Sequence, residues 1–245
     1  MDTTQSGAAD GFVVSSQGME ARRVFVSGGT GYVGGALVTQ LIARGHRARV
    51  LARRGSERKV PAGAEVVPGN ALDAATFSSA VSAEDTFVHL TGVAHPAPWK
   101  EQAFRAIDLV SLSASAAAAK SAGVRHFVYV SVAQPAPAMK AYIRVRQECE
   151  AILQSAGLTT TILRPWYVLG PGHRWPAALV PLYALLEAIP ATRPGALRLG
   201  LVTLQQIVTA LVWAIENPPP EAGKLESRIL DVPAIRRLSG ALLGR

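Results

Sequence analysis

The amino-acid sequence predicts an α/β protein whose parallel sheet is covered by helices on both faces. Short runs rich in β-branched residues alternate along the chain with alanine-rich or amphipathic segments. The runs are apolar at nearly every position, which is typical of parallel strands that are buried on both faces. The alternation of such strands with helices indicates a doubly wound sheet.

Six segments have the composition of these strands, and four have that of the helices between them. The predicted strands are RRVFVS (22–27), RARVLA (47–52), AEVVPG (64–69), TFVHLT (86–91), RHFVYVS (125–131) and TTTILRP (159–165). The predicted helices are YVGGALVTQLIARG (32–45), DAATFSSAVS (73–82), FRAIDLVSLSASAAAAKSAG (104–123) and the stretch around Tyr142.

The 245 residues, of which 49% are apolar, suffice for one sizeable core. Residues 1–20 are polar and rich in glycine and have no periodic pattern, so we expect a disordered tail. We assign residues 21–165 to the sheet core. Residues 166–245 are expected to form a small C-terminal lobe that is integrated with this core.

The sequence indicates a cytoplasmic protein. Cys149 is the single cysteine, which excludes an intrachain disulfide, and no basic and then apolar leader opens the chain. The most apolar stretches, 177–191 and 199–215, are short or interrupted by polar residues and proline, whereas a membrane-spanning helix needs roughly 20 apolar residues. We expect both stretches to be buried core. Membrane contact is therefore not expected.

A glycine-rich turn, SGGTGYVGG, follows the first strand directly and has the spacing G-x-x-G-x-x-G at Gly28, Gly31 and Gly34. Glycine allows the tight turn, the approach of a pyrophosphate and close packing of helix on strand. Amides at the start of the next helix would hold the phosphates. A simple tight turn is the alternative, but the place after the first strand favours dinucleotide binding. The expected contacts include Thr30, Tyr32 and Val33.

Positive charge is concentrated around the second predicted strand. The net charge is +8, and the segment 44–59 holds seven basic residues against one acid, a local net charge of +6. Such a cluster attracts phosphate. Nucleic acid is the rival partner, but no helix-turn-helix, zinc-ligand spacing or aromatic-basic interleaving accompanies the cluster. We therefore expect neither nucleic acid nor a metal as a ligand.

The second strand ends in LARRGSERK, where an NAD enzyme would place an acid on the ribose hydroxyls. Arg53 and Arg54 occupy this neighbourhood, and Glu57 lies too far into the loop to substitute. The planar arginine fork matches a 2′-phosphate, so the sequence favours NADP(H), with NAD(H) as the alternative. Ordinary solvated loop arginines would be the simpler interpretation.

These motifs together resemble the extended and atypical short-chain dehydrogenase/reductase superfamily, particularly its epimerase/dehydratase-like and NmrA-like members. The resemblance covers most of residues 22–232 and implies a Rossmann fold, while it leaves the reaction open. It rests on SGGTGYVGG, GNALD, HLTGVAH, AGVRHFVYVS, YIRVR and ILRPWYVLGPG.

The resemblance also implies roles for individual residues. Positions lining the cofactor groove would be Asn70, Ala71, Thr91, Gly92 and Pro165. Catalysis in the superfamily uses a tyrosine, a lysine four residues later that holds the nicotinamide ribose, and a serine or threonine after the fifth strand. Tyr142 matches the tyrosine, Ser131 is the nearest candidate for the serine, and Arg146 stands in place of the lysine.

Tyr142 and Arg146 share one face of a predicted helix. Arginine keeps the charge that favours a tyrosinate and can donate to a ribose hydroxyl, which makes Arg146 a candidate for both catalysis and cofactor binding. Its planar fork does not fit where a compact ammonium fits, so the exchange is not conservative. A packing tyrosine beside a surface arginine is the alternative.

The loop after the sixth strand is expected to lie where ligands bind in open α/β sheets. Candidate substrate residues are His95, Trp166, Tyr167, His173 and Trp175. Aromatic side chains suit a flat or apolar substrate, but they can equally pack the base of the C-terminal lobe.

Three functions remain open from the sequence. The first is an NADP(H)-dependent oxidoreductase or a sugar-nucleotide-modifying enzyme, with a small or apolar molecule favoured as substrate. The second is a cofactor-binding regulatory or complex-supporting module whose catalytic pair has degenerated. A third is a membrane-peripheral protein acting beside a quinone or lipid. A homodimer is compatible with each of them.

Overall fold

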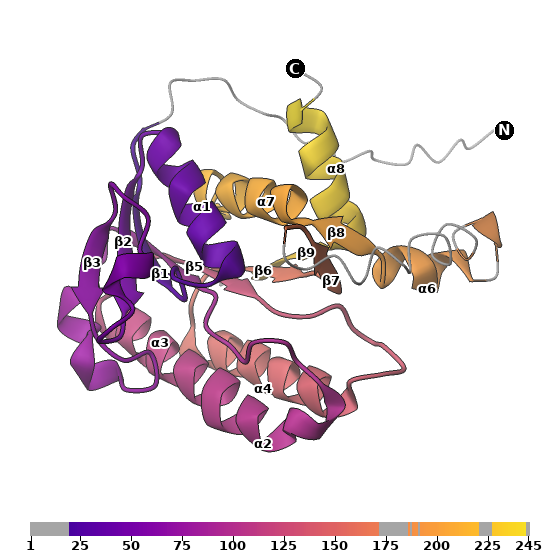
Figure 1. The fold of residues 1–245 in the computed structure, drawn as a ribbon, viewed down its shortest axis with the longest axis horizontal. Helices are drawn as coiled ribbons and strands as arrows, with labels where there is room; N and C mark the ends of the chain where they lie inside the picture. Colours follow the sequence, from indigo (N-terminus) through magenta and orange to yellow (C-terminus); the bar gives the residue numbers. More distant parts are fainter. Residues whose placement is uncertain (1–19, 172–185, 187, 191, 221–226, 244–245) are drawn as a thin grey trace, which may run out of the picture.

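The computed structural model describes residues 20–171, 186, 188–190, 192–220 and 227–243. It contains a seven-stranded parallel sheet with the order β3-β2-β1-β4-β5-β6-β9 (Figure 1). The strands are β1 (Arg23–Ser27), β2 (Arg47–Ala52), β3 (Glu65–Pro68), β4 (Asp85–His89), β5 (His126–Val130), β6 (Thr160–Arg164) and β9 (Ser227–Asp231). The predicted doubly wound parallel sheet is confirmed. Residues 1–19 of the predicted tail, His173, Trp175 and most of residues 177–191 lie outside the described residues.

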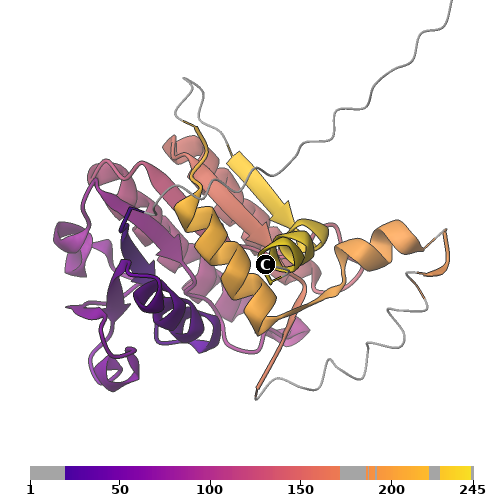
Figure 2. The same ribbon diagram turned by 90° about the horizontal axis from the view of Figure 1, so that it is seen from above.

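Helices cover both faces of this sheet (Figures 1 and 2). One face carries α1 (Tyr32–Ala43), α7 (Leu204–Glu216) and α8 (Val232–Leu243), and the other carries α2 (Glu101–Ala103), α3 (Val110–Ser121) and α4 (Lys140–Ala156). The C-terminal part of the chain thus adds one strand and two helices to the sheet core. Outside the sheet, β7 (Tyr167–Leu169) pairs with β8 (Leu201–Thr203), and α6 (Arg193–Arg198) lies close by.

All six predicted strands lie within a residue or two of observed ones, but β9 was not predicted. Among the residues that the structure describes, it is an edge strand paired with β6 alone, and Leu230 is its one buried residue. A strand exposed at the edge needs no continuous apolar run. Its sequence, SRILD, therefore lacks the signal that marks the other strands.

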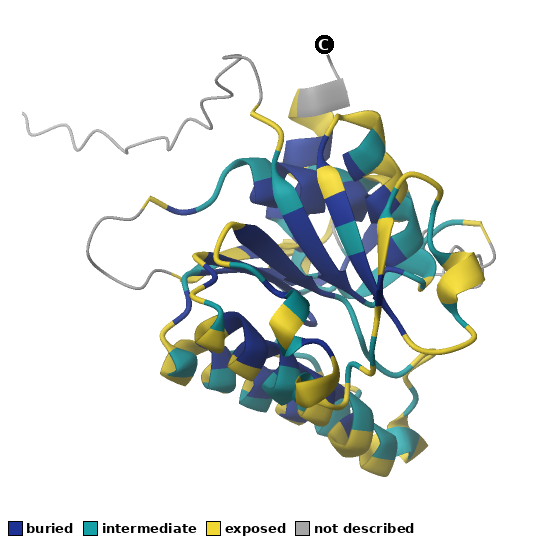
Figure 3. Ribbon diagram, turned by 90° about the vertical axis from the view of Figure 1, so that its left-hand side faces the viewer, coloured by how far each residue is buried: buried dark blue, intermediate teal, exposed yellow. Residues whose placement is uncertain are grey.

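The two faces of the sheet carry different side chains. Valines dominate the face beneath α1 and α7, whereas Phe25, Phe87 and Phe127 lie in register on the face beneath α3 and α4. Their ring centroids are 5.0 Å apart at each step from strand to strand. This aromatic row is fully buried between the layers, as the colouring of Figure 3 shows for the strands. It forms the floor against which α3 and α4 pack.

Two predicted helices differ from the observed structure. Residues 73–82 form two single 3₁₀ turns, η2 (Ala74–Thr76) and η3 (Ser78–Ala80), in place of a helix. Asp73 accepts a hydrogen bond from the Ala75 amide at 3.1 Å, and such local bonds compete with helix formation. The predicted helix 104–123 exists, but its first part, η5 (Phe104–Leu109), is a π-helix.

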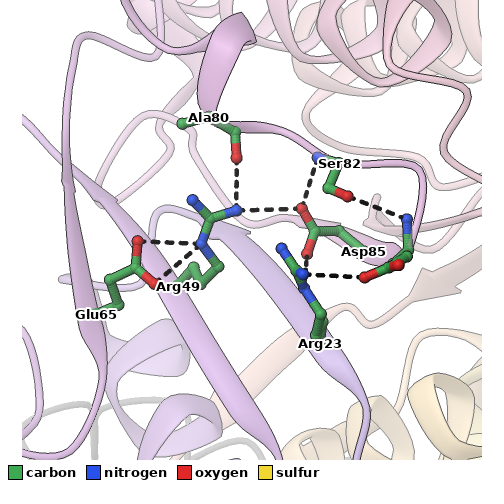
Figure 4. A network of polar contacts seen from close by, with 7 residues as sticks. Arg23, Arg49, Glu65, Ala80, Ser82 and Asp85 are labelled. Atoms are coloured by element: carbon green, nitrogen blue, oxygen red, sulfur yellow. Dashed lines mark hydrogen bonds and ion pairs between the residues drawn. The ribbon is translucent and has the colours of Figure 1, made fainter.

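A polar network fixes the amino-terminal edge of the sheet (Figure 4). The fully buried carboxylate of Asp85 lies 3.4 Å from both Arg23 Nε and Arg49 Nη1 and accepts a hydrogen bond from the Ser82 amide at 2.8 Å. Arg49 also donates to Glu65 at 3.2 Å. Arg23, Glu65 and Asp85 are the first residues of β1, β3 and β4, and Arg49 lies within β2. The network therefore connects four strands at the edge opposite the glycine-rich turn.

Candidate functional site

The glycine-rich turn after β1 has two glycines that the fold itself requires. Gly28 has a φ of 85°, and a Cβ atom at this position would lie 2.6 Å from the Leu90 carbonyl carbon. A Cβ atom at Gly34 would overlap the Gly28 carbonyl oxygen and lie 2.7 Å from the Gly29 Cα atom. Both glycines therefore allow the turn to pass between β4 and the first turn of α1.

Gly31 differs, because the fold alone does not explain it. It is exposed, and a Cβ atom there would contact only the Gly28 carbonyl oxygen, at 3.2 Å. Gly31 caps α1, which has neither a side-chain cap nor an acidic residue in its first turn. The first amides of α1 and the positive end of the helix dipole lie beside Gly31, and this arrangement fits a pyrophosphate.

Three further turns lie at the same carboxyl edge of the sheet. Arg53 and Arg54 are exposed just after β2, and Asn70 follows β3. The Asn70 side-chain oxygen accepts from the Leu72 amide at 3.1 Å, so it shapes its own turn, beside Ala71. Thr91 lies after β4, where its hydroxyl is 2.6 Å from that of Ser27. The parallel sheet therefore gathers the predicted cofactor residues along one edge.

Arg146 lies inside the protein on α4, and its guanidinium is engaged by protein groups. Nη2 forms an ion pair with Asp108 Oδ1 at 2.6 Å. Nη1 donates to the Tyr129 hydroxyl at 2.9 Å and to the Val130 carbonyl at 3.0 Å. Arg146 thus links α4 to β5 and η5, and a surface arginine, as in the alternative interpretation, is excluded.

Gly92 covers this ion pair. A Cβ atom on Gly92 would lie 2.7 Å from Arg146 Nη2 and 2.9 Å from Asp108 Oδ1. The backbone of the turn after β4 therefore rests directly on the pair, and a side chain at this position would displace Arg146 or Asp108. Asp108 also accepts a hydrogen bond from the Val93 amide at 3.1 Å, and this bond holds the turn against η5.

Tyr142, one turn before Arg146 on α4, is half-buried between two partners. Its ring centroid lies 4.8 Å from that of Phe104 and 4.9 Å from the Arg146 guanidinium carbon. Burial raises the pKa of the Tyr142 phenol, and the Arg146 cation acts in the opposite direction. The phenol therefore keeps its proton at neutral pH.

Ser131 and Pro165 follow the neighbouring strands β5 and β6. Ser131 is buried, and its amide donates to the Leu163 carbonyl at 2.7 Å. Its hydroxyl has no hydrogen-bond partner among the residues that the structure describes. The Pro165 carbonyl accepts from the Ala133 amide at 2.9 Å and so holds the chain after β5 in place.

Of the predicted substrate residues, the structure describes His95, Trp166 and Tyr167. His95 is exposed, with a φ of 49°, in the loop after β4. The Trp166 and Tyr167 rings meet edge to face at a centroid distance of 5.5 Å. Sequence reasoning did not name Trp99, whose side chain in the His95 loop is 82% exposed.

Asp108 was also missed. A signal was present, because Asp108 is the only charged residue between Arg105 and Lys120 in an otherwise apolar and alanine-rich stretch. A lone acid in a buried segment implies a buried cation as its partner. The sequence does not say which of the many arginines this partner is.

The family model for NAD(P)H-binding proteins matches residues 28–173 of this chain. Among curated proteins, the 3-diazoavenalumate denitrifying reductase of a Streptomyces species is 30% identical over 91% of this chain and 86% of its own length. The ceramide reductase of Caulobacter vibrioides is 25% identical over 80% of this chain, which spans 61% of that protein.

Solved structures show the same fold at lower identity. The Bordetella bronchiseptica enzyme WbmH, in complex with NAD+, superposes with a TM-score of 0.62 at 18% identity and covers 91% of this chain and 81% of its own. The Thermus thermophilus UDP-glucose 4-epimerase, in complex with NAD, gives 0.59 at 18% identity, with 91% and 84% covered. The family model, which matches more than half of the chain, and the Streptomyces reductase together show that the chain belongs to the family of NAD(P)H-binding proteins.

Proposed function

We propose that this protein is an NADP(H)-dependent reductase of a carbonyl group on a small or apolar molecule. The observation that carries the proposal is the place of Tyr142. Its protonated phenol lies at the start of α4, at the same edge of the sheet as the Gly31 turn, and is held between Phe104 and Arg146. A positioned acid beside a dinucleotide cradle is suited to carbonyl reduction.

The residues at this edge fit a dinucleotide. The amides after Gly31 would hold the pyrophosphate, the turn at Thr91 and Gly92 would lie beside the nicotinamide half, and Asn70 with Ala71 would lie near the adenine. NADPH, when bound, supplies a hydride. Arg53 and Arg54 are exposed where the adenosine ribose would lie, and their charge favours a cofactor with a 2′-phosphate.

Tyr142 and Ser131 would act on the carbonyl oxygen. A tyrosine that keeps its proton at neutral pH can donate it to the oxygen as that atom gains negative charge. The Ser131 hydroxyl, buried and unbonded among the described residues, is available to donate a second hydrogen bond there. Arg146 would act on Tyr142 through its charge, since its terminal nitrogens are bonded to protein groups.

The substrate class follows from the names of the curated relatives. They include a ceramide reductase, a 3 beta-hydroxysteroid dehydrogenase/isomerase of Mycobacterium tuberculosis and a farnesyl-dihydroquinoline-oxide ketoreductase of Stigmatella aurantiaca. Ceramides, steroids and farnesylated rings are apolar, whereas the UDP-sugar enzymes among the solved structures are more distant in sequence. The exposed Trp99 would suit contact with an apolar scaffold.

A cofactor-binding module without turnover is the second candidate. It is favoured by the same bonds of Arg146, because a guanidinium that serves Asp108, Tyr129 and Val130 is not free to hold a ribose as the lysine of the superfamily does. The two candidates share the cofactor site and differ only in whether Tyr142 transfers a proton.

The glycines of the turn are expected to separate folding from binding. Gly31→Val should lower the melting temperature less than Gly34→Ala does, since its Cβ atom would meet only the Gly28 carbonyl oxygen, at 3.2 Å, but weaken NADPH binding at least about tenfold by blocking the phosphates. Gly34→Ala should destabilise the fold by about 1–3 kcal/mol through overpacking. Gly35→Ala, with no atom closer than 3.8 Å, is the control. Thermal unfolding and fluorescence titration measure both, and normal binding by Gly31→Val would remove the loop as the phosphate site.

The basic residues after β2 are expected to set cofactor preference. The double variant Arg53→Ala/Arg54→Ala should bind NADPH about tenfold more weakly or worse, because it loses charge-assisted contacts to the 2′-phosphate. Its affinity for NADH should stay within about twofold. Fluorescence titration at two salt concentrations measures both cofactors, with Arg58→Ala/Lys59→Ala as a charge-matched control. Equal affinity of the wild type for NADPH and NADH would contradict the assignment.

Tyr142→Phe is expected to reduce turnover by roughly 10²–10⁴-fold, because it removes only the transferable proton. Phenylalanine keeps the ring contacts with Phe104 and Arg146, so NADPH affinity and melting temperature should be preserved. The measurement is NADPH oxidation against apolar ketones, aldehydes and quinones. Wild-type turnover by Tyr142→Phe would reject Tyr142 as the acid. No turnover by either protein on any substrate would favour the binding module.

A further inference from the structure

Asp108 contacts both sides of the candidate site. One carboxylate oxygen, Oδ1, pairs with Arg146 on α4, and the other, Oδ2, accepts the Val93 amide from the turn after β4. The side chain is fully buried. A single carboxylate therefore joins the helix that carries Tyr142 to the turn that would lie beside the nicotinamide.

The π-helix explains how one short segment reaches both residues of the pair. Phe104 begins η5 and packs against the Tyr142 ring, while Asp108 near its end binds Arg146. A π-helix is rare and recurs at functional sites, because its wider turn changes which side chains align. Here, η5 contacts α4 through two pairs of side chains, Phe104 with Tyr142 and Asp108 with Arg146.

Charge gives Asp108 a second effect on Tyr142. The Arg146 cation lies against the phenol ring and favours the phenolate, whereas the negative charge of Asp108 opposes it. The other titratable groups that face the pair are Cys149 on α4, Tyr129 on β5 and His89 on β4. His89 is buried, and its pKa is lowered to about 3, so it stays neutral where Tyr142 titrates. Asp108 is thus the counter-ion that limits the influence of Arg146.

We infer that Asp108 is a positioning residue that holds Arg146 off the cofactor, fixes the Thr91–Val93 turn and balances the positive charge that Arg146 places against the Tyr142 ring. This inference rests on the proposed function, because the role of Asp108 presupposes that Tyr142 is the acid. It also accounts for Gly92, because a Cβ atom there would push Arg146 or Asp108 out of the ion pair.

The titration of Tyr142 tests the inference without cofactor or turnover. Protein labelled with ¹³C at tyrosine Cζ is titrated by NMR, and Tyr142→Phe identifies the signal. Asp108→Asn leaves an amide oxygen for the Val93 amide but no counter-charge for Arg146. Tyr142 should then titrate about one pH unit lower or more, since a charge a few ångströms away has an effect of this size. Adding Arg146→Gln to Asp108→Asn should move the titration back up.

The matched control is Asp85→Asn, which also removes a buried carboxylate that faces two arginines, but at the opposite edge of the sheet (Figure 4). It should lower stability and leave the titration of Tyr142 unchanged. An unchanged titration in folded Asp108→Asn, or an equal shift in Asp85→Asn, would overturn the inference. Absence of turnover in the wild type would overturn only the proposed reductase function.

Asp108→Glu provides a second test if Asp108→Asn does not fold. It keeps the charge beside Arg146, but its carboxylate is one methylene further out and cannot keep both present contacts. The turn at Gly92 should therefore be displaced, and NADPH affinity should fall several-fold in protein that remains folded, at some cost in melting temperature from overpacking. Wild-type affinity in folded Asp108→Glu would contradict the positioning role.

Discussion

The buried ion pair between Arg146 and Asp108 joins the elements that surround Tyr142 in the candidate site. It connects α4 to η5 directly, to β5 through Tyr129 and Val130, and to the turn after β4 through Val93. Removing one partner of such a pair leaves an uncompensated charge in the core, which commonly costs about 3–5 kcal/mol. The shape of the site therefore depends on a contact that no substrate or cofactor makes.

Two other parts of the fold hold the elements that carry this pair: the aromatic row beneath α3 and α4, and the Asp85 network at the opposite edge of the sheet. The aromatic row of Phe25, Phe87 and Phe127 gives α3 and α4 a rigid apolar floor, so that the polar groups above it are excluded from water. Within such an environment a charge acts more strongly on its neighbours. At the other edge, the Asp85 network fixes the starts of the strands, and no residue of that network lies at the glycine-rich turn.

Most of the fold, including the glycine-rich turn after β1, could be predicted from the sequence, because local patterns encode it. Six strands are marked by continuous apolar runs, and Gly28, Gly31 and Gly34 are marked by their spacing. The edge strand β9 and the 3₁₀ turns after Asp73 lack such a pattern. The burial of Arg146 could not be predicted, since its partner lies 38 positions earlier in the chain, and spacing along α4 suggested only a shared face with Tyr142. Long-range charge pairing becomes visible only once the sheet brings the two segments together.

The central claim is that Arg146 bonds to protein groups and not to the cofactor, and acts on Tyr142 only through its charge. A crystal structure with bound NADP+ tests this claim most directly. The account predicts that Arg146 Nη2 stays within hydrogen-bond distance of Asp108, as in the 2.6 Å contact described above, while other groups hold the nicotinamide ribose and the Tyr142 hydroxyl faces the nicotinamide. An Arg146 side chain that has left Asp108 and donates to a ribose hydroxyl would contradict it.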